Sequence, residues 1–94
     1  MGNILVIAEH RNNELREITL QMLNKASELC RGSGHELCVA IMGNNIEGLV
    51  GELKGSANRV FVYNDPRLQG FDPDYYRDIL TALINEKKPL ITFL

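Results

Sequence analysis

The chain has 94 residues, of which 45% are hydrophobic and 23% are charged, and its formal net charge is −2. This length fits one domain, and the composition is that of a globular fold and not of a disordered or collagen-like chain. The basic residues are scattered, so we expect neither nucleic acid nor a membrane surface as a partner. The longest apolar run, Ile4 to Ala8, is far shorter than the roughly 20 residues that cross a bilayer.

The two cysteines, Cys30 and Cys38, lie in apolar surroundings and favour reduced thiols over a disulfide. The start of the chain lacks the basic and apolar regions of a secretory signal, so we expect a cytoplasmic protein. Cys30, His35 and Cys38 are residue types that bind zinc. A structural zinc site needs four ligands, however, so we expect no metal site.

The first element in chain order is a strand at Ile4–Ala8, whose continuous apolar run is typical of a parallel strand covered on both faces. We expect it to be central. A helix follows from about Ile18 to Cys30, and Arg31 to Gly34 end it with a cation and glycines. Its predicted apolar face consists of Ile18, Met22, Ala26, Leu29 and Cys30.

A second buried strand is predicted at Leu37–Met42, followed by Gly43. Asn44 and Glu47 have the spacing of a reciprocal helix cap, so we expect the second helix to begin there. Lys54 and Gly55 are expected to end it, with Gly55 in the left-handed conformation. The predicted apolar face of this helix is Ile46, Leu49, Val50 and Leu53.

The third strand, Arg59–Tyr63, mixes β-branched and aromatic residues and is expected at a sheet edge, with a turn at Asn64–Pro66. Asp72 and Pro73 are typical of the start of a helix, which Lys87, Lys88 and Pro89 end. A fourth strand follows at residues 90–94. The predicted apolar face of the third helix is Tyr76, Ile79, Leu80, Leu83 and Ile84.

The alternation of strands and helices predicts the α/β class, with a parallel sheet joined by right-handed crossovers. The chain stops inside an apolar strand with no helix after it, so we expect a further segment or a partner to cover that sheet face. The same exposed face predicts that the isolated chain self-associates or carries additional disordered residues.

Ligands of open parallel sheets bind beyond the carboxyl ends of the strands, which directs attention to the loops there. The loop after the first strand, residues 9–16, is charged and contains no glycine, so it is not a phosphate-binding turn. His10, which adjoins Glu9 in this loop, could act as an acid or a base. The alternative is a solvated histidine, because no nucleophile stands in the other strand-end loops.

Gly43 and Asn44 follow the second strand, and the amides of this turn could receive an anion. Because only one glycine is present, we favour a plain turn with a helix cap over an anion site. Tyr75 and Tyr76, with Asp72, Asp74 and Asp78, are interpreted as core-facing aromatics and the charged first turn of the third helix. Glu9, His10, Gly43 and Asn44 therefore remain the weak candidates for a site.

The run Ile4–His10, followed by Leu15, Thr19-Leu20 and Ala26, closely resembles the start of electron transfer flavoprotein alpha subunits. The resemblance continues through residues 39–43, 60–62 and 68–83, and so covers nearly the whole chain.

By this resemblance, the fold is a three-layer, Rossmann-like domain of the adenine nucleotide alpha hydrolase type, with four strands in the order 3-2-1-4, three helices, and an incomplete sheet. Family members are heterodimers that carry electrons from flavin dehydrogenases to an acceptor. Their FAD is held chiefly by the carboxy-terminal domain of the alpha subunit, and an AMP lies in the beta subunit.

The resemblance thus implies that residues 1–94 are the amino-terminal part of such a subunit, without the FAD-binding domain, and bind neither nucleotide alone. We expect an interaction scaffold for the beta subunit and the flavin domain, and no catalytic residue. Two alternatives stay open: a small nucleotide-binding module of the universal-stress-protein type, and an enzyme centred on Glu9 and His10.

Overall fold

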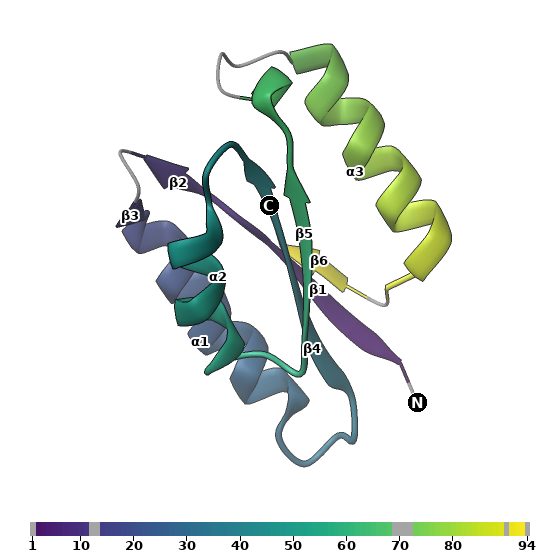
Figure 1. Ribbon diagram of the computed structural model, residues 1–94. Helices are drawn as coiled ribbons and strands as arrows, with labels where there is room; N and C mark the ends of the chain where they lie inside the picture. The colour runs from purple at the N-terminus through teal and green to yellow at the C-terminus, as the bar shows by residue number, and fades with distance from the viewer. Residues whose placement is uncertain (1, 12–13, 69–72, 90, 94) are drawn as a thin grey trace.

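A computed structural model describes residues 2–11, 14–68, 73–89 and 91–93 of the chain (Figure 1). Its elements in chain order are β1 (Asn3–Ala8), β2 (His10–Arg11), β3 (Glu14–Leu15), α1 (Glu17–Cys30), β4 (Glu36–Gly43), α2 (Glu47–Lys54), β5 (Arg59–Asn64), the 3-10 turn η1 (Pro66–Leu68), α3 (Pro73–Lys87) and β6 (Ile91–Phe93). Asp72 and the first and last residues of the predicted fourth strand lie outside the described residues.

The central layer is a parallel sheet of four strands in the order β5-β4-β1-β6. Numbered along the chain without the short β2 and β3, this is the expected order 3-2-1-4. β1 lies between β4 and β6, with Ile4 opposite both Leu37 and Ile91. The central position of β1 and the edge position of β5 are therefore confirmed.

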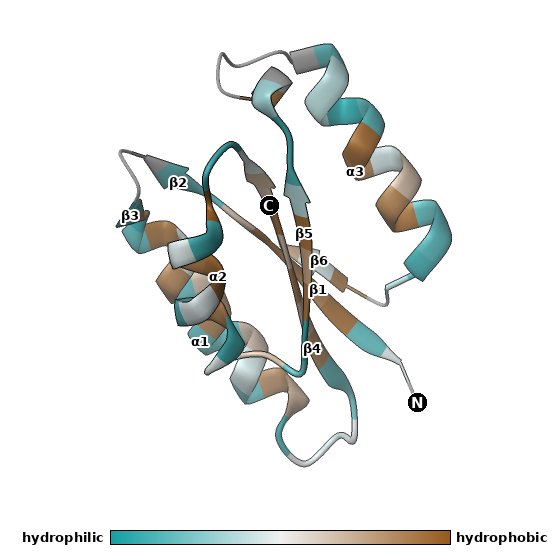
Figure 2. Cartoon of the chain, in the orientation of Figure 1, coloured by the Kyte–Doolittle hydropathy of each residue, from teal (hydrophilic) through white to brown (hydrophobic). Residues whose placement is uncertain are grey.

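Three layers are confirmed, because α1 and α2 cover one face of the sheet and α3 covers the other (Figure 1). Along β1, Ile4, Val6 and Ala8 pack with α1 and α2, whereas Leu5 and Ile7 pack with α3. Alternate side chains of a strand point to opposite faces, so a strand covered on both sides must be apolar throughout. In Figure 2 the middle of the sheet is accordingly hydrophobic.

The buried face of α1 differs from the predicted one. Thr19, Met22, Leu23 and Ala26 are buried, whereas Ile18 and Leu29 are 45% and 39% exposed. The helix is rotated so that the Thr19 hydroxyl reaches the backbone of Glu9, which moves Ile18 and Leu29 to the rim. The predicted face of α3 is confirmed, with Leu83 only 1% exposed.

The predicted caps of α2 are wrong. The helix begins at Glu47 with Ile46 at the capping position, and no side chain caps it. Asn45 has a φ of 58°, and this left-handed turn places Ile46 in the core at 1% exposure, with Asn44 outside the helix. Gly55 has a φ of −74°, so it is not left-handed. The glycine turn after α1 is confirmed, because Gly32 and Gly34 have φ values of 76° and 78°.

No helix of the described residues is long and apolar enough to cross a membrane.

Candidate functional site at the carboxyl ends of the strands

The carboxyl ends of β1, β4 and β5 meet at one edge of the sheet, where Glu9 follows β1 and Gly43 ends β4. Ala8 and Ile41 are register partners, so Glu9 and His10 lie beside the last residues of β4. The structure thus brings together three of the four predicted site residues, Glu9, His10 and Gly43. Asn44 follows them directly and is half-buried.

His10 folds over the end of β4. Its Nε2 atom lies 2.8 Å from the carbonyl oxygen of Met42. A carbonyl oxygen only accepts hydrogen bonds, so Nε2 carries the hydrogen, and in the neutral ring Nδ1 is the nitrogen with the lone pair. A Cβ atom on Gly43 would lie 2.6 Å from Nε2, so the glycine makes room for the imidazole. His10 is therefore fixed by packing and is not a freely solvated loop side chain.

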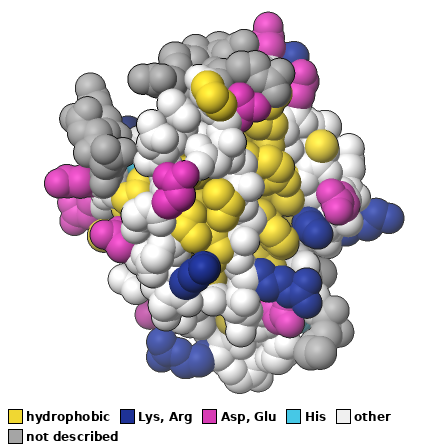
Figure 3. Space-filling model, in the orientation of Figure 1, with side chains coloured by type: hydrophobic (Ala, Val, Ile, Leu, Met, Phe, Trp, Pro, Cys, Tyr) yellow, Lys and Arg dark blue, Asp and Glu magenta, His cyan; other side chains and the backbone are white. Residues whose placement is uncertain are grey.

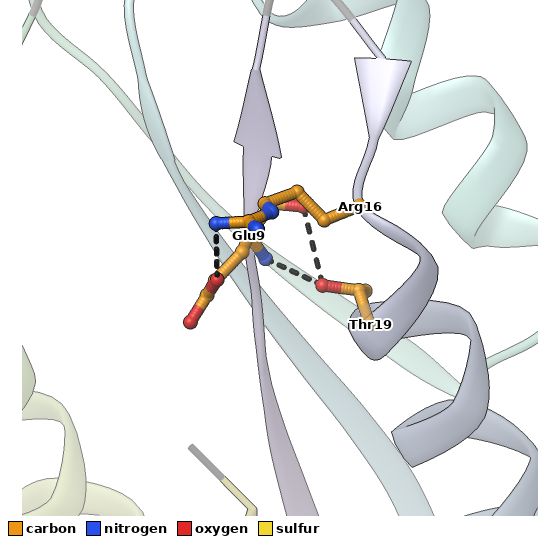
Figure 4. Close-up of polar contacts among 3 residues, drawn as sticks. All are labelled: Glu9, Arg16 and Thr19. Atoms are coloured by element: carbon orange, nitrogen blue, oxygen red, sulfur yellow. Dashed lines mark hydrogen bonds and ion pairs between the residues drawn. The ribbon is translucent and has the colours of Figure 1, made fainter.

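Glu9 is held at its backbone by the start of α1 (Figure 4). Its N–H donates to Thr19 Oγ1 at 2.7 Å, and the Thr19 hydroxyl lies 3.2 Å from the Glu9 carbonyl oxygen. The Arg16 N–H also donates to that carbonyl at 2.9 Å, which closes the loop between β1 and α1. The Arg16 and Glu9 side chains form an exposed ion pair at 3.7 Å.

Between these two anchors the predicted polar loop forms a small antiparallel ladder. His10 in β2 pairs with Leu15 in β3, and Arg11 pairs with Glu14. The ladder satisfies backbone groups that would otherwise depend on water, and it directs His10 back toward β4. Residues 12 and 13 at its turn lie outside the described residues.

Three further polar contacts at this edge come from Asn64 and Asp65, which the sequence indicated only as a turn. Asn64 Oδ1 accepts the N–H of Asn45 at 3.0 Å, and Asn64 Nδ2 donates to Glu47 at 2.6 Å. Tyr75 donates its hydroxyl to Asp65 at 2.9 Å, which ties α3 to the end of β5. In the sequence, the signal that could have indicated Asn64 and Asp65 was their position directly after a predicted strand.

A cavity of about 540 Å³ opens between the end of β5 and α3. Its walls combine apolar and acidic side chains: Val62, Tyr63, Asn64, Asp65, Tyr75, Asp78, Ile79 and Ala82. Tyr75 therefore lines this cavity in addition to tying α3 to β5, a role that its interpretation as a core-facing aromatic missed.

Burial changes the acid–base behaviour of two tyrosines near the cavity and the site. Burial raises the pKa of Tyr76, and the negative charge of Glu9 raises it further. Burial and the charge of Glu86 raise the pKa of Tyr63. Both hydroxyls therefore hold their protons to higher pH than an exposed tyrosine does.

The cysteines are not activated nucleophiles. Both are free, and burial raises the pKa of the Cys30 and Cys38 thiols above their ordinary value of 9.0. A thiol with a raised pKa holds little of the reactive thiolate at neutral pH. The part of the chain that the structure describes also contains no group of three His, Cys, Asp or Glu side chains placed to hold a metal ion.

Comparison with known proteins relates this arrangement to a family. Residues 4–94 match the electron transfer flavoprotein domain, which is nearly the whole chain. The chain belongs to the electron transfer flavoprotein domain family. The match favours this family over the universal-stress-protein alternative.

Several curated relatives of this family are similar to the chain. The electron transfer flavoprotein subunit alpha of Clostridium acetobutylicum is 33% identical over 97% of the chain, and that of Methylophilus methylotrophus is 32% identical over 100% of it. The lactate dehydrogenase (NAD(+),ferredoxin) subunit LctC of Acetobacterium woodii is 33% identical over 92% of the chain. The chain spans only 27%, 29% and 21% of the lengths of these relatives, respectively.

The residues at the strand ends do not fit the pyrophosphate of FAD. That group needs glycines where the backbone approaches it and amides that are free to donate. The space beside Gly43 is filled by His10 and Ile46, and the Asn45 amide donates to Asn64. Among the residues that the structure describes, the turn after β4 therefore does not form a phosphate cradle.

Proposed function

We propose that residues 1–94 are the amino-terminal part of an electron transfer flavoprotein alpha subunit and act as its interaction scaffold. The observation that carries the proposal is the family match over residues 4–94, and two of the relatives described above are named as alpha subunits. The sheet order 3-2-1-4 that the resemblance implied agrees with this assignment.

In this role the chain itself catalyses no step of electron transfer. By the resemblance to the family, FAD is held chiefly by another domain of the alpha subunit, and AMP by the beta subunit. Two observations on the described residues support this: the space beside Gly43 is filled, and the pKa values of the Cys30 and Cys38 thiols are raised.

The partners of the scaffold are the beta subunit and the flavin-holding domain. The clamp that joins Glu9, Arg16 and Thr19 supports this role, because it gives a polar loop at the sheet edge a defined shape. A preformed loop loses little conformational entropy when a partner binds it. We place the protein in the cytoplasm, in keeping with its two free thiols.

The first test is an intact mass and a visible absorption spectrum of the purified chain, before and after incubation with FAD. A mass near 10.6 kDa without flavin bands is expected. Coexpression with a beta subunit of the family should yield a complex of the two on gel filtration. Stoichiometric FAD on the chain alone, or failure to bind the beta subunit, would contradict the scaffold proposal.

A titration with AMP by calorimetry provides the control for the nucleotide-binding alternative. We expect no heat of binding at concentrations up to about 1 mM. Micromolar affinity would restore the universal-stress-protein interpretation.

A further inference from the structure

The outer edge of β5 lies open between the helices. Among the described residues, β4 is the one strand that pairs with β5. Figure 1 shows β5 between α2 and α3, with its outer edge toward the viewer and neither helix in front of it. The backbone N–H and C=O groups along such an edge form a template for another strand.

The sequence of β5 lacks the usual protection of a strand edge. Between Arg59 and Asn64 lie only Val60, Phe61, Val62 and Tyr63, without a lysine, a proline or an acidic residue. The Val62 side chain is 44% exposed. Figure 3 shows hydrophobic side chains gathered over this face of the molecule. Edge strands of monomeric proteins are normally short, charged or covered, so this edge is suited to pairing.

The two ends of this edge carry opposite charges on the same face of the sheet. Arg59 is the register partner of Cys38, whose side chain packs on the α3 side, and its own side chain is 63% exposed. Asp65 follows the strand six positions later, a spacing that returns to the same face. It lines the cavity beside α3 together with Asp78.

We propose that two copies of this chain pair antiparallel along β5 and join their sheets into one. A two-fold axis at Val62 places Val62 opposite its own copy, Phe61 opposite Tyr63 and Arg59 opposite Asp65. Val62, Phe61 and Tyr63 then meet apolar partners on their own faces, and Val60 meets Asn64. Each edge supplies one cation and one carboxylate to the other. The edge is complementary to itself.

Within one chain, the Arg59 and Asp65 side chains already have partners. The proposed pairing along β5 leaves these contacts in place. Arg59 contacts Glu36 at 3.2 Å, and Asp65 accepts a hydrogen bond from Tyr75. A guanidinium group has five N–H donors and a carboxylate accepts several hydrogen bonds, so both groups retain capacity for a contact across the axis. The proposal is independent of the scaffold function, because it uses neither the loop after β1 nor a partner subunit.

The test is sedimentation equilibrium of the wild-type chain, of Val62→Lys and of Ile91→Lys. Val62 and Ile91 are a matched pair, since each is 44% exposed and lies in an edge strand on opposite sides of the sheet. We expect a wild-type dimer, an increase of its Kd by about tenfold or more in Val62→Lys, where two ammonium groups meet at the axis, and no change in Ile91→Lys. Circular dichroism checks that both variants fold.

A monomeric wild-type chain at about 1 mM overturns the proposal, as does a dimer that Ile91→Lys disrupts and Val62→Lys leaves intact. Val62→Cys tests the register without adding a charge. Directly opposite residues of antiparallel strands lie within disulfide reach, so mild oxidation should link two copies of Val62→Cys and leave wild type and Ile91→Cys unlinked. Equal cross-linking of Val62→Cys and Ile91→Cys would also overturn the proposed pairing.

Discussion

At the scale of single residues, Thr19 connects the helix layer to the end of β1. It is fully buried among apolar neighbours, and its hydroxyl satisfies both the N–H and the carbonyl oxygen of Glu9. A buried polar group is tolerated when its hydrogen bonds are made, and here one hydroxyl satisfies two backbone groups at the point where the strand becomes a loop. Thr19 is therefore a positioning residue for Glu9 and His10.

Replacement of Thr19 tests this role. Thr19→Val keeps the shape but leaves the Glu9 N–H without its acceptor, so we expect the free energy of unfolding to fall by about 1–3 kcal/mol. Thr19→Ser keeps the hydroxyl and loses one methyl group, which costs about 1 kcal/mol. Urea unfolding measures both, and hydrogen exchange at the Glu9 amide should accelerate only in Thr19→Val. Equal exchange in the two variants would contradict the clamp.

Gly43 provides a second test at this scale, because an added Cβ would meet His10 at 2.6 Å and Ile46 at 2.8 Å. We expect Gly43→Ala to lower the free energy of unfolding by about 1–3 kcal/mol. His10→Ala in the same chain should remove part of that loss, since the two residues share one contact.

The matched control is Gly48→Ala in α2, where an added Cβ meets nothing within 4 Å. There the change should stabilise the protein by about 0.5–1 kcal/mol, because alanine favours the helix over glycine. If Gly48→Ala also destabilised the protein, the loss of stability in Gly43→Ala would reflect the replacement of any glycine and not the packing of His10.

At the scale of elements, α3 covers one face of the sheet, whereas α1 and α2 share the other. Leu83 is the most deeply buried residue described in α3, at 1% exposure, and it packs with side chains of β1 and β4. The contact of Tyr75 with Asp65 fastens the first half of the same helix to β5. The attachment of α3 thus combines one fully buried leucine, the partly buried Tyr76, Ile79, Leu80 and Ile84, and one polar link.

Shortening the Leu83 side chain should lower the stability of the protein. We expect Leu83→Ala to lower the free energy of unfolding by about 2–5 kcal/mol, because it removes buried methyl groups and leaves a cavity. Leu20→Ala in α1 is the control, since Leu20 is 48% exposed, and it should change the value by less than about 1 kcal/mol. Chemical unfolding followed by circular dichroism compares the two, and similar losses would contradict the assigned core.

At the scale of the whole molecule, the buried titratable groups determine how stability depends on pH. Burial raises the pKa of Cys38 above 9.0 and that of Tyr76 above 10.0, so the folded state disfavours their ionised forms. The unfolded chain releases these protons at lower pH than the folded chain does. The stabilisation is complete below the unfolded pKa values and is lost as pH rises through the folded ones.

We therefore expect the free energy of unfolding to decline above pH 9.0, where the unfolded Cys38 thiol ionises, and more steeply above pH 10.0, where Tyr76 joins it. Denaturant midpoints at successive pH values measure this. Cys38→Ala should weaken the decline at its onset, and Tyr76→Phe should weaken it at higher pH. If stability declined with pH as steeply in both variants as in the wild-type chain, groups other than Cys38 and Tyr76 would cause the decline.

The regular elements of this protein could be predicted from local patterns. The runs Ile4–Ala8 and Leu37–Met42 are short and apolar at every position, which is typical of a strand covered on both faces, and the structure confirms both. The strand order required the family resemblance, because hydrophobic periodicity does not distinguish which strands are neighbours. The caps of α2 could not be predicted, since Asn44 and Glu47 matched a local rule that burial of Ile46 overrode.

The location of the candidate site could be predicted from the sequence, but the contacts within it could not. The rule that loops at the carboxyl ends of parallel strands meet led to Glu9, His10, Gly43 and Asn44. The hydrogen bond from His10 to Met42 joins residues 32 positions apart, and the one from the Asn45 N–H to Asn64 joins residues 19 apart. No local spacing encodes such contacts.

By itself, the sequence determined the α/β class, the number of main strands, the apolar faces of most helices and the absence of a glycine-rich phosphate loop after β1. These properties follow from residue type and period, which act over a few positions. Only the tertiary structure decided the rotation of α1 onto Glu9, the packing of His10 over Gly43 and the open edge of β5. Each of these depends on the distance between segments remote in the chain, which the packing of the whole sheet establishes.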